Sequence, residues 1–134
     1  MKDHLSVGAL GENIACEYLK KNRFKILERN VRRPWGEIDV IARDRSGVLV
    51  FVEVKTLKKR GEESALRPED NMTRSKILKT QKMAGMFANE HPELVDDRRG
   101  WRVDLITISL PVDGDSELTS ELEDCVINHL ENVE

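Results

Sequence analysis

Residues 48–55 read Val-Leu-Val-Phe-Val-Glu-Val-Lys, and this stretch decides the fold that we expect. It is mostly apolar and rich in β-branched side chains, a composition typical of a strand in the interior of a sheet. Helical and strand-like patterns occur in the chain both before and after it. The sequence therefore predicts one α/β domain in which residues 48–55 form a central strand.

The other predicted elements surround that strand. Apolar residues recur at helical spacing over 6–21, with Ser6 as the N-cap. We expect strands at 24–31, 37–43 and 101–109, a polar loop at 58–68, a long helix at 68–89, and a weaker element, strand or short helix, at 123–130. A chain of 134 residues buries enough surface to form a core without disulfides or metals.

The composition excludes several classes of protein. No apolar run approaches the roughly 18 residues that span a bilayer, and the N-terminus carries no apolar signal stretch. We therefore expect a cytoplasmic protein with no membrane partner. Cys16 and Cys125 are isolated from each other in the sequence, which favours two packed thiols. The three histidines have no second ligand at the spacing of a structural zinc site.

The net charge of −3 hides an uneven distribution. Residues 1–82 carry 19 Lys and Arg against 12 Asp and Glu, whereas residues 83–134 carry 3 against 13. Residues 111–134 hold eight of those acids and no Lys or Arg. The basic half predicts an electropositive face for nucleic acid, partly screened by residues 112–124. Two solvated surfaces of opposite sign would give the same counts.

Four charged residues interrupt the two predicted strands on either side of the predicted turn Arg45-Ser46-Gly47. Side chains alternate between the faces of a strand, so Glu37 and Asp39 share one face, and Glu53 and Lys55 share one face. A three-residue loop that ends at Gly47, which suits the positive φ needed there, puts Asp39 opposite Glu53. The same register puts Glu37 opposite Lys55. A loop of two or four residues would instead send the two pairs to opposite faces.

Charges clustered in this way need compensation, because burying an unpaired charge costs several kcal/mol. A divalent cation would offset the repulsion between Asp39 and Glu53, and oxygen ligands favour Mg²⁺ or Mn²⁺. Lys55 beside the cation would orient or deprotonate a water that attacks phosphorus. A structural ion-pair network, in which Lys55 neutralises Glu37 and Glu53, is the alternative. A glycosidase is disfavoured, since the carboxylates lie too close for an inverting pair and lysine has no role there.

Asp39, followed after thirteen residues by Glu53-Val54-Lys55, resembles the signature of the PD-(D/E)xK, or restriction-endonuclease-like, nuclease superfamily. Longer motifs closely resemble the YraN family, an uncharacterised bacterial group related to archaeal Holliday-junction resolvases. They include Gly8-Ala9-Leu10-Gly11-Glu12-Asn13-Ile14-Ala15, Asn30-Val31-Arg32, Gly36-Glu37-Ile38-Asp39-Val40-Ile41-Ala42, Val50-Phe51-Val52-Glu53-Val54-Lys55-Thr56, Arg102-Val103-Asp104-Leu105-Ile106 and Ile127-Asn128-His129. The resemblance covers most of residues 8–130 and departs from the family between Leu57 and Arg67.

This resemblance implies an α/β fold with a mixed central sheet flanked by helices over residues 1–110. It also implies that an element near 124–130, in the acidic C-terminal segment 111–134, packs on the same domain. The implied activity is that of a Mg- or Mn-dependent endonuclease acting on DNA, on branched or damaged structures, and the resolvases favour a homodimer. The alternative is a non-catalytic nucleic-acid-binding or protein-interaction module with the same fold.

The resemblance also assigns roles to individual residues. Asp39 and Glu53 match metal ligands, the Val54 carbonyl matches a further ligand, and Lys55 matches the catalytic lysine, to which the strand pattern adds Glu37. Glu12 matches the acidic residue of the first helix that completes the metal cluster. Independently, the small residues Gly8, Gly11 and Ala15 would let that helix approach the sheet closely. An exposed acid favoured by the helix dipole is the other interpretation of Glu12.

Cations gather in residues 20–33, where seven of them accompany a single acid. We assign this band to phosphate binding, although a solvated surface would have the same composition. Its members are Lys20, Lys21, Arg23, Lys25, Arg29, Arg32 and Arg33. Lys76 and Lys79 on the predicted second helix either reach the scissile phosphate or are plain surface lysines. Trp35 either stacks on a base or packs within its turn.

Overall fold

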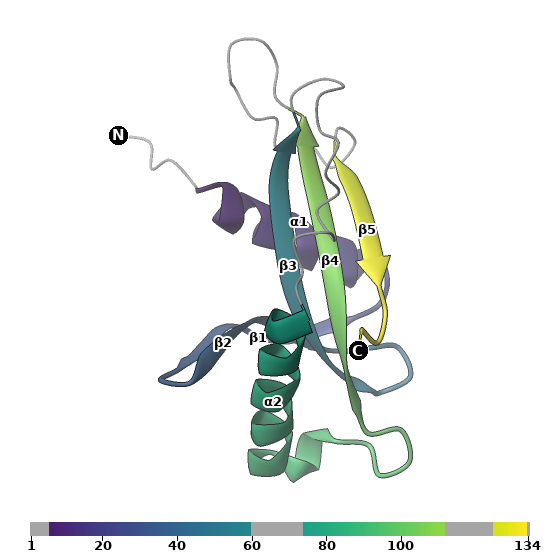
Figure 1. The fold of residues 1–134 in the computed structure, drawn as a ribbon. Coiled ribbons are helices and arrows are strands. Elements are labelled where there is room, and N and C mark those ends of the chain that lie inside the picture. Colours follow the sequence, from purple (N-terminus) through teal and green to yellow (C-terminus); the bar gives the residue numbers. More distant parts are fainter. Residues whose placement is uncertain (1–5, 60–73, 112–124, 134) are drawn as a thin grey trace, which may run out of the picture.

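The apolar run at 48–55 supplies most of the third strand, in the middle of a five-stranded sheet (Figure 1). A computed structural model describes residues 6–59, 74–111 and 125–133. In chain order the elements are α1 (Val7–Lys21), β1 (Lys25–Arg33), β2 (Gly36–Arg43), β3 (Leu49–Lys59), α2 (Arg74–Glu90), the 3₁₀ turn η3 (Pro92–Leu94), β4 (Trp101–Pro111) and β5 (Val126–Leu130).

The sheet is mixed, and its strands follow one another in the order of the chain. β3 and β4 run parallel, and the other three neighbouring pairs run antiparallel. The parallel pair needs a crossover connection, which contains α2. The predicted α/β class, with a mixed central sheet flanked by helices, is confirmed.

Two hydrophobic cores lie on the two faces of the sheet, because the central strands are apolar on both sides. Val50 and Val52 of β3 pack in the first core with Leu19 of α1. Phe51, which points to the other face, packs in the second core with Phe87 of α2. The alternation along β3 thus places α1 and α2 on opposite faces (Figure 1).

Helix α1 lies very close to β3 at one point. It begins at Ser6, whose hydroxyl accepts a hydrogen bond from the Ala9 N–H at 3.1 Å, as expected of an N-cap. Gly11 then faces Thr56 of β3 so closely that a Cβ added at Gly11 would overlap the threonine side chain. Of the glycines predicted to bring this helix against the sheet, Gly11 does so and Gly8 does not.

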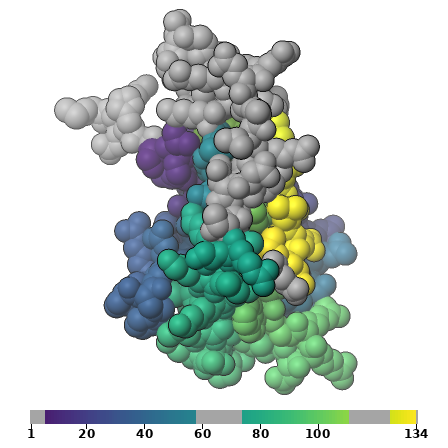
Figure 2. All heavy atoms as spheres, in the orientation of Figure 1, coloured from purple at the N-terminus to yellow at the C-terminus, as the bar shows by residue number. Residues whose placement is uncertain are grey.

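The β1–β2 hairpin leaves the rest of the sheet near its tip. The ladder between β2 and β3 ends at the pair Val40–Val52, whereas β1 and β2 stay paired as far as Arg33 and Gly36. Figure 1 shows the hairpin diverging from β3, and Figure 2 shows it beside α2 on the same face of the molecule. The divergence opens a gap between β2 and β3 at Asp39.

Several boundaries differ from the sequence prediction. β3 continues to Lys59 because β4 pairs with it throughout, so two positions of the predicted polar loop belong to a strand. The weaker element at 123–130 is a strand, β5, added antiparallel to β4. The remainder of that loop, the first turns of the predicted second helix and the acidic stretch 112–124 lie outside the described residues. Among the described helices, none is long and apolar enough to cross a bilayer.

Candidate functional site

The turn between β2 and β3 fixes which side chains face each other. The Asp44 N–H donates to the Val48 carbonyl at 2.9 Å, and the Asp44 carboxylate accepts from two N–H groups of the loop. Gly47 adopts a φ of +91°, a left-handed conformation that costs glycine little. The predicted three-residue loop is confirmed, and with it the register of the hairpin.

Asp39 and Glu53 lie one step beyond the last pair of the β2–β3 ladder. Their carboxyl groups are close enough for the charge of Asp39 to act on Glu53. Asp39 Oδ2 also accepts a hydrogen bond from the Val54 N–H at 2.9 Å. The Val54 N–H has no backbone acceptor on β2, because the β2–β3 ladder ends at Val40–Val52, and the Asp39 carboxylate accepts its hydrogen bond instead.

The two carboxyl groups hold protons more tightly than isolated ones. Burial raises the pKa of Asp39, and the charge of Glu37 raises it further, against the lowering effect of the Val54 N–H. Burial and the neighbouring charge of Asp39 raise the pKa of Glu53 from 4.5 to about 7. Two carboxylates in one half-buried site repel each other, so at neutral pH the pair has a strong tendency to share a proton.

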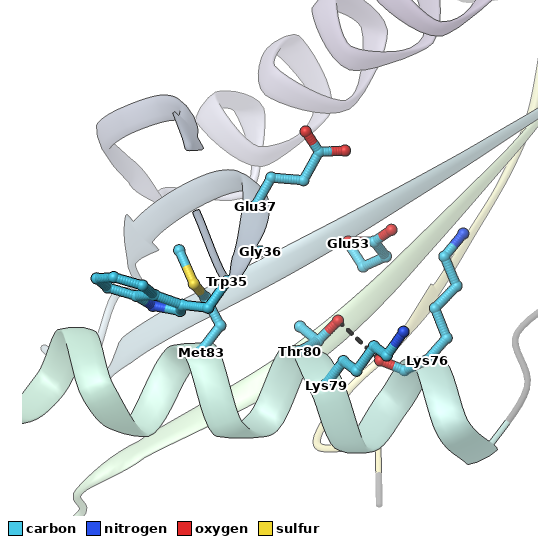
Figure 3. Close-up of a pocket in the computed structure, with 8 residues that line it drawn as sticks. All are labelled: Trp35, Gly36, Glu37, Glu53, Lys76, Lys79, Thr80 and Met83. Atoms are coloured by element: carbon cyan, nitrogen blue, oxygen red, sulfur yellow. Dashed lines mark hydrogen bonds between the residues drawn. The ribbon is translucent and has the colours of Figure 1, made fainter. Parts of the chain in front are cut away.

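Two lysines lie beside this pair. Lys55 follows Glu53 at the next position on the same face of β3, and Lys76 approaches from the first turns of α2 (Figure 3). Hydrogen bonding to Lys76, followed by burial, lowers the pKa of Lys55. Both carboxylates act in the opposite direction on Lys55. The site therefore combines two acidic groups and two lysines on the α2 face of the sheet.

Glu37 does not pair with Lys55, and this prediction from the register is wrong. Only residues 40–43 of β2 pair with β3, so Glu37 lies in the part of β2 that pairs with β1 alone, opposite Arg32. Its carboxylate lies 3.7 Å from the Arg32 guanidinium and is 65% exposed. Glu37 nevertheless stays close enough to raise the pKa of Asp39.

Glu12 reaches the same region from the other side, from α1. Burial and the charge of Asp39 raise its pKa, while Arg29 acts to lower it. With its amide oriented by the hydrogen-bond network, Asn30 of β1 donates to Glu12 Oε1 at 3.0 Å. The half-buried placement of Glu12 agrees with the prediction that α1 delivers it toward the carboxylate pair. Asn30 was not predicted as a site residue, although it lies within one of the quoted motifs.

The Val54 backbone borders the gap in β2–β3 pairing. In an extended strand the N–H and C=O of one residue point to the same edge. Since the Val54 N–H donates to Asp39, its carbonyl faces the same gap. Three oxygen-bearing groups of β2 and β3 therefore border this gap: the carboxylates of Asp39 and Glu53 and the Val54 carbonyl.

The predicted basic band is divided between the two ends of β1. Arg29, in the middle of β1, donates to Asn13 of α1 at 2.7 Å, and Arg32 and Arg33 lie at the hairpin tip, where Arg32 pairs with Glu37. Lys20 and Lys21 belong to the last turn of α1, and Arg23 and Lys25 follow it, up to the first residue of β1. All seven side chains are exposed. The first group borders the carboxylate site, and the second group is separated from it by most of β1.

A second polar cluster, centred on Asp104 of β4, was not predicted from the sequence. Asp104 is fully buried and accepts hydrogen bonds from Arg102 at 2.9 Å and from the Asn132 N–H at 2.9 Å, and its other oxygen lies 2.7 Å from His129 Nε2. Although burial acts to raise it, these partners hold the pKa of Asp104 below its usual value. The tyrosine hydroxyl of Tyr18 joins the cluster through His129 Nδ1 at 3.1 Å. The sequence signal was an acid within an otherwise apolar strand.

The carboxylate site has donor chemistry that fits a hard divalent cation. Asp39 and Glu53 offer oxygens, and a cation would remove the repulsion that raises their pKa values. In the ranges that the structure describes, however, no three His, Cys, Asp or Glu side chains come together as a ready-made metal centre. The fit thus rests on two carboxylates and the backbone edge of β3, with Glu12 as a more distant third carboxylate.

The chain has clear relatives among known proteins. Residues 11–108 match the family described as "Uncharacterised protein family UPF0102". A UPF0102 protein of Oleidesulfovibrio alaskensis is 39% identical over 106 residues, which cover 79% of this chain and 49% of that protein. A UPF0102 protein of Beutenbergia cavernae is 35% identical over 103 residues, which cover 77% of this chain and 81% of that protein. The chain spans less than half the length of several of the curated relatives that it matches.

Among solved structures, one similar chain belongs to the "Structure of EndoMS-dsDNA2 complex". It is 16% identical, with a TM-score of 0.42, and the match covers 77% of this chain and 36% of that chain.

Proposed function

The chain belongs to the UPF0102 family of uncharacterised proteins, also called YraN, and we propose that it is a metal-dependent nuclease that hydrolyses phosphodiester bonds of DNA. The observation that carries this proposal is the half-buried Asp39–Glu53 pair at the end of the β2–β3 ladder, with Lys55 on the same face of β3. Perturbed pKa values cluster at functional sites, so this pair beside a lysine supports a catalytic role.

Asp39 and Glu53 would hold a Mg²⁺ or Mn²⁺ ion together with the Val54 carbonyl, and Glu12 would contribute from α1. When bound, such an ion supplies Lewis-acid polarisation of the phosphoryl oxygen and stabilises the leaving oxygen. The raised pKa of Glu53, about 7, means that part of this ligand set is protonated at neutral pH. Metal binding therefore releases a proton and grows stronger as the pH rises through 7.

The lysines have separate roles in the proposed reaction. The Lys55 ammonium, next to Glu53 along β3, orients the attacking water by a hydrogen bond. Lys76, at the start of α2, lies beside Lys55 and binds a non-bridging phosphate oxygen. Exposed cations of the basic band hold the flanking phosphates. The exposed carboxylate of Glu37 lies at the edge of the site, and its charge raises the pKa of Asp39.

A non-catalytic nucleic-acid-binding or protein-interaction module is the second candidate. One observation favours it, namely that the described residues contain no group of three metal-ligating side chains. In that case the proximity of Lys55 and Lys76 to the carboxylates would be a structural ion-pair network. Under either function we expect a cytoplasmic protein and a homodimer.

A cleavage panel tests the nuclease proposal. Linear, flapped, nicked and four-way DNA are incubated with the full chain in Mg²⁺ or Mn²⁺, and we expect cleavage of at least one branched form. Lys55→Ala should abolish cleavage while leaving the fold and most DNA affinity intact. Lys82→Ala, an exposed lysine of α2, is the matched control and should cleave as the wild type does. Wild-type cleavage rates in Lys55→Ala would reduce Lys55 to an ion-pair partner.

A further inference from the structure

Trp35 is an exposed indole at the tip of the β1–β2 hairpin. Of its surface, 54% is open to solvent, although tryptophan is among the side chains that gain most from burial. The other tryptophan, Trp101, is half-buried and packs edge-on against Phe51, with 5.7 Å between the ring centroids. Packing within the turn therefore accounts for less than half of the surface of Trp35.

A cavity of about 210 Å³ lies between the hairpin tip and α2 (Figure 3). Trp35 and Met83 line one end, and Glu53 and Lys76 line the other. A cavity of about 150 Å³ accommodates one benzene ring, whereas drug-sized ligands occupy roughly 300–1,000 Å³. The cavity therefore has room for a single flat ring system and little more.

The two ends of the cavity differ in polarity. The indole and the thioether of Met83 make one end apolar, which suits the face of an aromatic ring. The other end opens on the carboxylate site, where Lys76 of α2 lies beside Lys55. Lys79 also lines the cavity from α2 and is exposed. A nucleotide combines a flat ring with a phosphate, so it offers one suitable group to each end of the cavity.

We propose that this cavity holds one unpaired nucleobase of a DNA strand, stacked on Trp35, with its flanking phosphate directed toward Lys76 and the Asp39–Glu53 pair. The inference rests on the proposed function and deepens it by naming the substrate class. That class is DNA that offers an unpaired nucleotide, as flaps and gaps do. In continuous duplex both faces of each base are stacked, and exposing one costs a few kcal/mol.

Trp35 itself provides the readout of the first experiment. The full chain carrying Trp101→Phe has one tryptophan, so its emission reports on the hairpin tip alone. It is titrated in EDTA, without cleavage, with a single-stranded oligodeoxynucleotide and with the same strand annealed to its complement. We expect the single strand to quench the Trp35 emission in a saturable manner and the duplex to change it little.

Affinities measured by anisotropy of the labelled DNA complete the test. Trp35→Ala should weaken single-strand binding by about 5- to 150-fold, the range found for one base–aromatic stack, and duplex binding far less. Trp35→Phe should restore most of the loss. Leu78→Ala removes an apolar side chain of α2 that is similarly exposed, at 51%, and should change neither affinity.

The outcomes separate this inference from the proposed function. If DNA binds but Trp35 emission stays constant, or if Trp35→Ala weakens both DNA forms equally, the base-binding cavity is wrong while the nuclease proposal stands. If the wild-type chain binds neither form, the proposed function fails and the inference fails with it.

Discussion

At the scale of single residues, the Asp39–Glu53 pair is the costly feature of this protein. Two unit charges about 5 Å apart repel by roughly 1–3 kcal/mol at effective dielectric constants between 80 and 20. The Val54 N–H and the nearby lysines offset part of this repulsion, and a shared proton offsets more. The free energy of unfolding of the metal-free protein should therefore depend on the charge of this pair.

We predict that Glu53→Gln stabilises the metal-free protein and removes a pH dependence. In the wild type the folded state retains a proton on Glu53 that the unfolded chain has released, so stability falls as the pH rises from about 4.5 to about 7. Glutamine can still donate to Asp39 but carries no charge. Chemical denaturation in EDTA should show a gain of about 1–3 kcal/mol at pH 8 and a flatter profile over that window.

Glu28→Gln, an exposed glutamate of β1, is the control and should shift stability by no more than about 0.5 kcal/mol. A clear loss of stability in Glu53→Gln would indicate that Glu53 anchors a structural salt-bridge network with Lys55.

At the scale of secondary-structure elements, the position of α1 determines where Glu12 lies. Gly11 is a point of close approach between α1 and β3, since a methyl group there would overlap Thr56. Gly8, one turn earlier in the same helix, has no atom within 4 Å of an added Cβ. The two glycines therefore make a matched pair in which only one carries the packing constraint.

We predict that Gly11→Ala destabilises the protein by about 1–3 kcal/mol, as overpacking does. Gly8→Ala should instead stabilise it by about 0.5–1 kcal/mol, because alanine favours the helix. Thermal melts of the two variants measure the difference. Equal changes in stability for the two variants would mean that α1 does not pack closely against β3 at Gly11.

Local sequence rules predicted the part of the site that depends on neighbouring residues. Asp44 and Gly47 determine the turn and thereby bring Asp39 to Glu53. The part of β2 that precedes Val40 diverges from β3, and this divergence depends on how the hairpin packs against α2. No local sequence pattern encodes that packing. The predicted pairing of Glu37 with Lys55 was wrong for this reason. The contact of Lys76 with Lys55 likewise depends on the docking of α2, although Lys76 was assigned to the site by its place on a predicted helix.

At the scale of the whole molecule, the basic band and the carboxylate site lie along one hairpin. From Lys25 to Arg33, β1 extends over about 26 Å at the usual rise per residue. A DNA strand advances about 3.4 Å per nucleotide, so β1 matches seven or eight phosphates. A DNA strand that follows β1 from Lys25 toward Arg33 would reach the hairpin tip and the carboxylate pair.

We predict that the last turn of α1, which precedes β1, contributes phosphate contacts as the hairpin tip does. Replacing Lys20 and Lys21 by alanine should reduce the slope of log K against log salt by about 2, one contact for each lysine. Arg98→Ala with Arg99→Ala, an exposed pair before β4, is the control and should leave the slope unchanged. A slope that responds to Arg29 and Arg33 but not to Lys20 and Lys21 would confine DNA to the hairpin tip.

Calorimetric titration with Mn²⁺ tests most directly whether the Asp39–Glu53 pair is a metal site. We expect saturable binding to the wild-type chain at pH 7.5, accompanied by proton release because Glu53 is partly protonated near its pKa of about 7. Asp39→Asn and Glu53→Gln should each abolish binding, and Glu28→Gln should retain it. Saturable Mn²⁺ binding that persists unchanged in Asp39→Asn and Glu53→Gln, or no binding to the wild type, would contradict the metal site and the nuclease proposal.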